Sequence, residues 1–328
     1  MGCGVTKGER WTNRTDMRPF ATWIYARCLA ARGLRRKAWL CARAAAVRLL
    51  GDPPCAMTVH GRTLRMPLSH PLPDYLTRHR FYDRLPRRLA DFLRRARGCL
   101  AAIDVGANIG DTLAALAPQA GDRLLAIEPD PTFFGCLQRN WGDDPRVTLR
   151  QEFCGAACGD GRFAIREQNG SATITPDEHG RPLRCATLDA LTRDTPFASG
   201  VDLLKIDTDG HEFEVLEGAR DLLRRDRPAL LIECDARGDP DFGERCAGLF
   251  ARLATCGYHG FLVYDNYGLL MGRHTCADTS AFRELLAYQQ AGGCYYFDLL
   301  VMDAASLEPF AAAEAAFFAR ETAGEGRE

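Results

Sequence analysis

The 328-residue sequence lacks several features that would assign it to other protein classes. No window reaches about 18 apolar residues without a charge, the length that a membrane-spanning helix needs. The N-terminal region lacks the uninterrupted apolar core before a cleavage site that is typical of a secretory signal. The 14 cysteines form no C-x-x-C pair and no Cys/His pattern with zinc-ligand spacing. We therefore expect a cytoplasmic protein whose cysteines are reduced and act mainly as small core residues.

Acidic side chains are scarce in the first part of the chain. Residues 1–100 contain 21 Lys and Arg against 6 Asp and Glu, whereas residues 101–328 contain 21 against 37, so the formal net charge of −1 hides a basic arm on an acidic domain. Such an arm either docks on its own domain or makes a peripheral contact with an anionic partner. Of the possible anionic partners we favour a membrane surface or a glycan over nucleic acid.

The arm itself has a helical pattern. Residues 18–50 mix arginines with aromatic and aliphatic side chains, which predicts either a helical hairpin packed on the main domain or a helix lying on a membrane. Residues 55–69 are predicted to form a short extended pair around His60 and Gly61. Residues 82–97 are predicted to form an arginine-rich helix that leads into the first strand of the sheet and can form a lid over its carboxyl edge. We divide the chain into an arm (1–55), a lid segment (56–98), a main domain (99–303) and a C-terminal helix and tail (304–328).

The stretch from residue 101 to residue 131 carries the strongest pattern. A short apolar run is followed by the glycine-rich turn DVGANIG, a helix at 111–117 and a second apolar strand at 124–127 that ends in Glu128. A strand, a glycine-rich turn, a helix and a strand ending in an acid form the unit that binds nucleoside-bearing cofactors in open α/β sheets. Glycine lets the backbone approach the ligand closely, and the acid can accept hydrogen bonds from ribose hydroxyls.

The spacing of the glycines favours one cofactor over another. A dinucleotide site has the pattern G-x-G-x-x-G, whereas this turn has Asn108 at the place of the second glycine, between Gly106 and Gly110. Asp104 also places a carboxylate near the turn, where it would repel a pyrophosphate but attract the amino group of S-adenosylmethionine. The turn therefore predicts S-adenosylmethionine as the cofactor, with NAD as the alternative.

A second group of chemically active side chains follows another buried strand. The segment VDLLKIDTDGHE places Lys205 inside a strand at 201–206 and Asp207 at its end, followed by a helix at 211–223. In a doubly wound sheet this strand neighbours the first one, so both ends face one crevice. The acids after the strand also suit a helix N-terminus, but a buried lysine needs a partner. Asp207, Glu233 and Asp235 could share a divalent ion, yet they have no dedicated ligand spacing, and we predict no metal site.

The remaining pattern predicts a mostly parallel, doubly wound α/β sheet. Asp130 and Pro131 begin a helix that runs to about residue 140. Further strands are expected at 147–153, 229–232, 261–264 and 295–301, with extended segments within 164–175. A short helix is expected to start at residue 187, a second helix at 247–255, a loop plus helix over 270–290 and a terminal helix after residue 302. The strands at 261–264 and 295–301 are expected to close the sheet as an antiparallel hairpin.

Four motifs, in this order and spacing, resemble the FkbM-type family of S-adenosylmethionine-dependent methyltransferases. They are Ile103–Asp111 (IDVGANIGD), Glu128–Pro131 (EPDP), Thr187–Asp189 (TLD) and Leu204–Glu212 (LKIDTDGHE). The resemblance covers about residues 66–302 and includes HPLP at 70–73, NGSA at 169–172, YDN at 264–266 and YYFD at 295–298. The family often has Glu where this chain has Asp209.

The resemblance implies a Rossmann-like class I methyltransferase fold and O-methylation of a hydroxyl on a sugar, glycan, glycolipid or secondary metabolite. It implies these catalytic or acceptor-positioning residues: Asp207 first, then His211 and Glu212, with Lys205 paired to a carboxylate. It implies these cofactor contacts: Asp104, Gly106, Ala107, Asn108, Gly110, Asp111, Glu128, Asp130, Glu152 and Phe153. The alternatives are an NAD-dependent sugar-modifying enzyme and a non-catalytic binding protein with the same fold.

Overall fold

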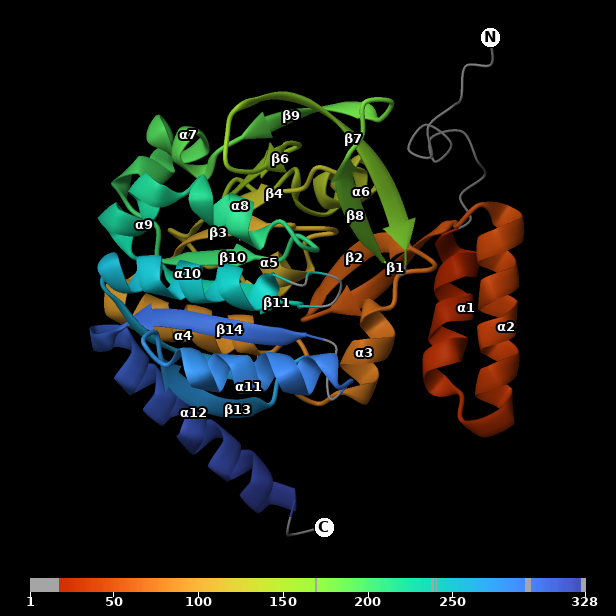
Figure 1. Ribbon diagram of the computed structural model, residues 1–328. Coiled ribbons are helices and arrows are strands. Elements are labelled where there is room, and N and C mark those ends of the chain that lie inside the picture. The colour runs from red at the N-terminus through yellow and green to blue at the C-terminus, as the bar shows by residue number, and fades with distance from the viewer. Residues whose placement is uncertain (1–17, 169, 237–238, 240, 293–295, 326–328) are drawn as a thin grey trace.

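The computed structural model of the protein describes residues 18–168, 170–236, 239, 241–292 and 296–325 (Figure 1). Its helices are α1 (Arg18–Ala30), α2 (Gly33–Leu50), α3 (Leu72–Arg78), α4 (Leu85–Arg97), α5 (Asp111–Leu116), α6 (Pro131–Trp141), α7 (Leu188–Arg193), the 3₁₀ turn η2 (Pro196–Ser199), α8 (Glu212–Glu217), α9 (Arg220–Asp226), α10 (Phe242–Thr255), α11 (Thr279–Gln290) and α12 (Ala304–Glu325). Asn169 and Tyr295, quoted in two of the motifs, lie outside the described residues.

The strands form three sheets. They are β1 (Pro54–Val59), β2 (Arg62–Pro67), β3 (Ala101–Val105), β4 (Arg123–Ile127), β5 (Val147–Arg150), β6 (Phe153–Cys154), β7 (Gly159–Gln168), β8 (Ser171–Pro176), β9 (Arg181–Ala186), β10 (Leu203–Ile206), β11 (Ala229–Cys234), β12 (Tyr258–Asp265), β13 (Leu270–Thr275) and β14 (Phe297–Asp303). The central sheet has the order β13-β12-β14-β11-β10-β3-β4-β5, in which β11, β10, β3, β4 and β5 are parallel. The predicted doubly wound α/β sheet is therefore confirmed.

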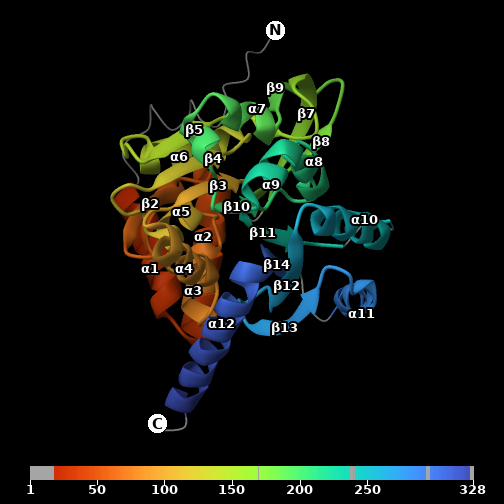
Figure 2. The same cartoon turned by 90° about the vertical axis from the view of Figure 1, so that its left-hand side faces the viewer.

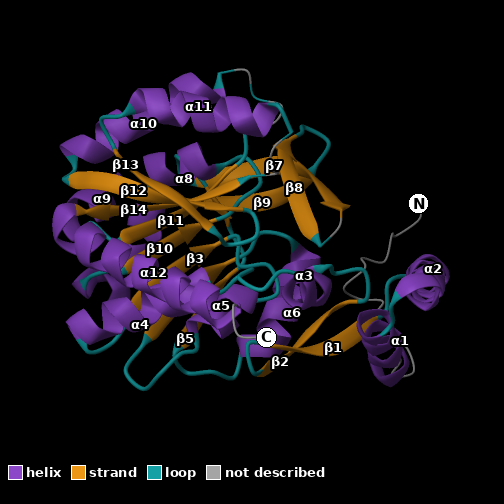
Figure 3. Ribbon diagram, turned by 90° about the horizontal axis from the view of Figure 1, so that it is seen from below, coloured by secondary structure: helices purple, strands orange, loops and turns teal. Residues whose placement is uncertain are grey.

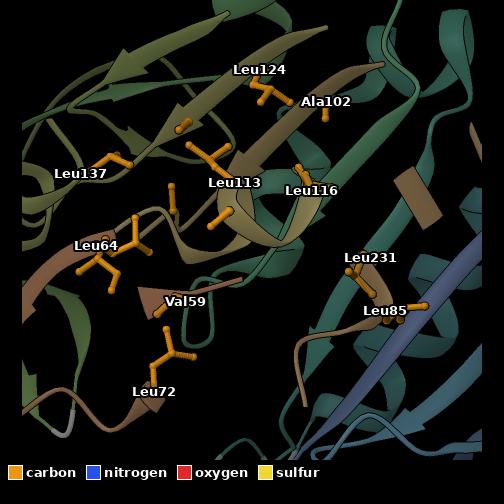
Figure 4. Close-up of a cluster of buried hydrophobic side chains, with 14 of the residues drawn as sticks. Val59, Leu64, Leu72, Leu85, Ala102, Leu113, Leu116, Leu124, Leu137 and Leu231 are labelled. Carbon is orange, nitrogen blue, oxygen red and sulfur yellow. The ribbon is translucent and has the colours of Figure 1, made fainter. Parts of the chain in front are cut away.

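Two hydrophobic cores cover the two faces of this sheet. Alternate residues of each strand face opposite sides, so Ala102 belongs to one core and Ile103 to the other. Helices α4, α5, α6 and α12 cover one face, and α8, α9, α10 and α11 cover the other (Figure 3). Figure 4 shows part of the first core, in which Leu64 of β2 belongs to the same cluster as Leu113 of α5 and Leu137 of α6.

The N-terminal arm is a helical hairpin that joins the first core. Ala21, Ile24 and Tyr25 on α1 are buried in the same cluster as the residues of the β1–β2 pair. Gly51 ends α2 in the left-handed conformation that glycine adopts without steric penalty. The hairpin stands beside α3 at the side of the main domain (Figure 1). Among the helices that the structure describes, none is long and apolar enough to cross a membrane.

Several predicted elements have different boundaries in the structure. The predicted helix at 211–223 is two helices, because Asp189 accepts hydrogen bonds from the N–H groups of Asp221 and Leu222 and so caps α9 separately. The predicted strand at 147–153 is also divided: β5 stays in the central sheet, whereas β6 pairs with β9 in a small sheet of order β6-β9-β7-β8.

The end of the chain differs from the predicted hairpin in its connection. Strands β12 and β14 do pair antiparallel, as expected, but the chain first adds β13 at the sheet edge, within the segment predicted as a loop plus helix. Helix α4 begins at residue 85 and α10 at residue 242, while α3 was not predicted. The final helix α12 packs on β12 and β14 and then extends beyond the sheet (Figure 2).

Candidate active site

The carboxyl ends of β3 and β10 meet where the strand order reverses. After β3 the chain adds β4 and β5 on one side and later places β10 and β11 on the other. The loops that follow β3 and β10 therefore diverge, and open α/β sheets bind their ligands in the crevice that this leaves. Here the crevice is a cavity of about 660 Å³. Cavities that bind small molecules measure roughly 300–1,000 Å³.

The glycine-rich turn forms the floor of the cavity. Gly106 has φ +82°, and a Cβ atom at this residue would lie 1.7 Å from the carbonyl oxygen of Asp207. No side chain fits there, so the turn after β3 and the turn after β10 approach each other directly. Asn108 also has a positive φ, +49°, and its N–H donates to Oε2 of Glu128 at 2.8 Å.

Glu128 lies at the end of β4 with 5% of its surface exposed. Its Oε2 accepts from Asn108 and its Oε1 accepts from the N–H of Asp130 at 2.8 Å. Each carboxylate oxygen keeps further capacity to accept, which suits a ligand with two neighbouring hydroxyls. Burial raises the pKa of Glu128 to about 8, so the charged form of this acid gains most from a ligand that brings hydrogen-bond donors or positive charge.

One wall of the cavity combines an apolar surface with an unpaired acceptor. The ring of Phe153 lies 4.9 Å from the ring of His211 in an edge-to-face contact. His211 is fixed by a 2.6 Å hydrogen bond from Nε2 to the carbonyl oxygen of Ile174, since a carbonyl can only accept. Beside them, Oε2 of Glu152 is buried without a hydrogen-bond partner. A flat heterocycle that carries an amino group would satisfy this oxygen.

Charged side chains follow one face of the central strands. Lys205 on β10 is in register with Asp104 on β3, and Glu233 on β11 is in register with Asp298 on β14. The ammonium of Lys205 lies 3.4 Å from Oδ1 of Asp104 and 2.9 Å from Oδ2 of Asp207. Burial opposes the charge of Lys205, but Asp207 and Asp104 outweigh it and raise the pKa of this ammonium. The predicted pairing of Lys205 with a carboxylate is therefore present.

Of the other two acids, Glu233 lines the cavity and Asp298 lines the smaller space next to it. Burial, with the charge of Asp207 adding to it, raises the pKa of Asp298 to about 8 and also raises the pKa of Glu233. The carboxyl of Asp298 is therefore mostly protonated near neutral pH and can donate a hydrogen bond there. The hydroxyls of Tyr82 and Tyr296, which line the same cavity, share a hydrogen bond, and burial raises the pKa of both phenols.

Aromatic side chains form the mouth of the cavity. The rings of His79 and Tyr267 stack at 4.0 Å, and those of Tyr75 and Tyr82 lie 5.3 Å apart. Tyr75 is on α3, and Tyr267 follows the end of β12. Within the predicted lid segment, the aromatic residues that line the cavity lie on and after α3 rather than on α4.

The structure divides the predicted site residues into two groups. Nine line the cavity: Gly106, Asn108, Asp111, Glu128, Glu152, Phe153, Lys205, Asp207 and His211. Five do not line it: Asp104, Ala107, Gly110, Asp130 and Glu212. Asp130 caps α6 by accepting from two backbone N–H groups, Gly110 packs against Trp141, and Asp104 acts through Lys205. Glu212 accepts from the N–H groups of Thr208 and Gly210 and thereby holds the turn.

Sequence reasoning did not single out the aromatic mouth or the tyrosine pair. The signal lay in their positions next to strand ends. Asn266 and Tyr267 directly follow β12, and Tyr296 directly precedes β14. Loops at the carboxyl edge of such a sheet carry the residues that contact ligands. The described residues include no group of three or more His, Cys, Asp or Glu side chains that could hold a metal ion.

The residues present fit S-adenosylmethionine. The close approach at Gly106 leaves room for a ligand over the turn, Glu128 can accept from ribose hydroxyls, and the unpaired oxygen of Glu152 can accept from an adenine amino group. Carboxylates outnumber cations among the groups around Asp207. This balance suits a ligand with a sulfonium and an ammonium group, and it would repel a pyrophosphate.

The comparison with family models agrees with this assignment. Residues 104–259 match the model of the methyltransferase FkbM domain. No curated protein matches the chain. Among solved structures, methyltransferase FkbM from Methylobacillus flagellatus KT is 16% identical with a TM-score of 0.36, and the match covers 91% of this chain and 63% of that one. An S-adenosylmethionine-dependent methyltransferase from Geobacter sulfurreducens, in complex with S-adenosyl-L-homocysteine, is 13% identical with a TM-score of 0.34, and the match covers 70% and 94%.

The family domain spans β3 to the start of β12 and so contains the glycine-rich turn, Glu128 and the Lys205–Asp207 segment. The structure places these three parts around one cavity at the switch point of a doubly wound sheet. The chain contains a methyltransferase FkbM domain at residues 104–259.

Proposed function

We propose that this methyltransferase acts on a hydroxyl group of a sugar, in a glycan, a glycolipid or a glycosylated metabolite. The observation that carries the proposal is the position of Asp207. Lys205 holds only Oδ2 of this carboxylate, and 37% of the side chain is exposed in the cavity. The other oxygen is available to accept a proton, which a sugar hydroxyl must lose when it is methylated.

The cavity mouth supports a sugar as the acceptor. Stacked aromatic rings, such as those of His79 and Tyr267, offer flat apolar surfaces to the C–H faces of a sugar ring. Tyr296, Glu233 and Asp298 add hydrogen-bonding groups on the inner side. A hydroxyl-rich ring can therefore be held on one face by stacking and at its edge by hydrogen bonds, whereas a highly anionic acceptor meets a surplus of acids.

For this reaction the protein mainly has to position the acceptor hydroxyl, because the methyl group of the cofactor is already electrophilic. When bound, S-adenosylmethionine supplies a methyl group on a positively charged sulfur. Asp207 would accept the hydroxyl proton at its free oxygen while the acceptor oxygen takes the methyl group, and the sulfonium would leave as a neutral thioether. Lys205 fixes the orientation of that carboxylate, and Asp104 fixes Lys205 from the neighbouring strand. Holding the hydroxyl in line with the methyl group supplies much of the rate.

The experiment that tests the acceptor class uses S-adenosylmethionine with a labelled methyl group. The enzyme is incubated with separate glycan, lipid and small-molecule extracts, and the products are hydrolysed and analysed for methylated sugars by mass spectrometry. We expect label on a sugar oxygen. Label only on nitrogen or carbon of another class of molecule would refute the proposal. Isothermal titration that detected NAD but not S-adenosylmethionine would support the alternative enzyme class.

We further propose that the α1–α2 hairpin holds the enzyme against an anionic membrane surface at its cytoplasmic side. Residues 18–50 contain eight Arg and Lys and no Asp or Glu. At the hairpin tip Leu34 is 83% exposed between the exposed Arg32 and Arg35, and Trp23 on α1 is 46% exposed. Basic side chains with exposed aromatic and aliphatic groups are typical of interfacial helices.

Vesicle sedimentation tests the membrane contact. The enzyme should bind vesicles that contain phosphatidylserine but not vesicles of phosphatidylcholine alone. Replacing Arg35 and Lys37 together by Glu should abolish this binding, because each basic residue near an anionic surface contributes about 1 kcal/mol. Equal binding of the variant and the original protein would show that the arm only packs on its own domain.

A further inference from the structure

The N-terminal hairpin is bonded to the backbone of the lid segment. Arg43 on α2 donates from Nε to the carbonyl oxygen of Leu68 at 2.7 Å and from Nη2 to that of His70 at 2.9 Å. The hydroxyl of Tyr25 on α1 donates to the same oxygen of His70, and the guanidinium of Arg43 stacks over the Tyr25 ring at 4.0 Å. The lid backbone at His70 is therefore held from two helices at once.

His70 passes this constraint on to the glycine-rich turn. The N–H of Leu72 donates to Nδ1 of His70 at 3.3 Å, so Nδ1 carries no hydrogen. The hydrogen is then on Nε2, which lies 3.2 Å from Oδ1 of Asn108 and donates to it. Burial lowers the pKa of His70 to about 4, which keeps the imidazole in this neutral form at neutral pH.

Asn108 in turn connects the lid to two other parts of the cofactor cavity. Its side-chain amide donates to the carbonyl oxygen of Gly170 in the β7–β8 turn at 2.8 Å, and its backbone N–H donates to Glu128. Gly170 also touches the lid, since a Cβ at this residue would lie 2.4 Å from Pro71. The side chain of Asn108 is thus held between the His70 ring and Gly170, while its backbone N–H holds Glu128.

We propose that Arg43 is a positioning residue of the cofactor site, acting through His70 to hold Asn108 and, with it, the backbone donor that fixes Glu128. The hairpin lies outside the matched family domain, so nothing in residues 104–259 alone assigns it this role. The inference concerns the cofactor side of the cavity and does not depend on which acceptor is methylated. It makes the N-terminal arm a part of the site in addition to any contact with a membrane.

Isothermal titration with S-adenosylhomocysteine tests the proposal without any acceptor. We expect Arg43→Ala to raise the Kd about tenfold, because two hydrogen bonds to the lid are worth roughly 0.5–1.5 kcal/mol each and 1.4 kcal/mol is a factor of ten. Arg43→Lys should recover part of the affinity. The matched control is Arg48→Ala on the same helix, an exposed arginine, which should leave the Kd unchanged. A Kd for folded Arg43→Ala equal to that of the original protein would overturn the proposal.

Two further measurements separate positioning from general loss of structure. Tyr25→Phe removes only one hydroxyl and should fold even where Arg43→Ala does not; it should raise the Kd for S-adenosylhomocysteine about threefold, near the lower end of the value of one hydrogen bond. In turnover assays Arg43→Ala should raise KM for the cofactor and leave KM for the acceptor unchanged. An equal rise in both values, or an unchanged Kd in Tyr25→Phe, would assign these residues to packing alone.

Discussion

Replacing Lys205 by Met tests how the buried charges of the site are balanced. Asp104 is only 2% exposed, and the Lys205 ammonium at 3.4 Å is the one positive charge that faces it among the described ion pairs. Asp207 also contacts Lys205, but its side chain is 37% exposed and water can solvate it. The loss of Lys205 therefore affects mainly Asp104, whose carboxylate would remain buried without a partner.

The structure sets the size and the pH dependence of this effect. Removing one partner of a buried ion pair costs about 3–5 kcal/mol. Burial already raises the pKa of Asp104, against the effect of Lys205, and the variant raises it further. A carboxyl with a raised folded-state pKa loses stability as the pH rises through that pKa. We therefore expect Lys205→Met to lower the free energy of unfolding by about 3 kcal/mol at pH 8 and by much less at pH 5.

Urea denaturation of the two proteins at both pH values measures this difference. Lys37→Met, on the exposed surface of α2, is the control for losing one positive charge and should change the free energy of unfolding by less than about 0.5 kcal/mol. Adding Asp104→Asn to Lys205→Met should restore most of the loss, because the uncompensated charge is gone. A loss at pH 5 as large as at pH 8 would refute the electrostatic explanation.

Three further results are expected from the geometry of the site and its supports. Because burial raises the pKa of Glu128 to about 8, the affinity for the cationic S-adenosylmethionine should rise between pH 6 and pH 9. Titration calorimetry of Glu128→Gln should show no such rise with pH. The same rise in this variant would contradict the role of Glu128. Gly106→Ala should abolish cofactor binding. Gly61 has nearly the same φ, +81°, but open space around it, so Gly61→Ala should cost only about 1–2 kcal/mol of stability and leave cofactor binding intact. Equal effects of the two substitutions on cofactor binding would contradict the close approach at Gly106. Asp189→Ala should lower the free energy of unfolding by about 1 kcal/mol through loss of the α9 cap and leave the cofactor Kd unchanged, and a weaker Kd would place Asp189 in the site.

The central sheet was predictable because its signals are local. Short apolar strands, a capped helix at Asp130 and glycines in the turn each follow from a few neighbouring residues. Lys205 was informative for the same reason, since a charge within a strand core requires a partner, and the register places Asp104 beside it.

The parts that could not be predicted depend on distant contacts. The break between α8 and α9 follows from Asp189, more than 30 residues earlier in the chain, so the local helical pattern could not reveal it. The sequence-based interpretation of Glu212 failed to see its role in the turn, because only the fold brings its carboxylate to the N–H groups of Thr208 and Gly210. The link from Arg43 to Asn108 passes through two backbone carbonyls of the lid, which leave no mark in a sequence.

The most direct test of the account is methyl transfer by Asp207→Asn, measured together with cofactor binding. The substitution keeps the size of the side chain and removes its capacity to accept a proton. We predict that the variant still binds S-adenosylmethionine in titration calorimetry but, with the cofactor at saturation, transfers the labelled methyl group at least about 100-fold more slowly. Unchanged turnover in a variant that binds the cofactor normally would contradict the central claim that Asp207 takes the proton of the acceptor.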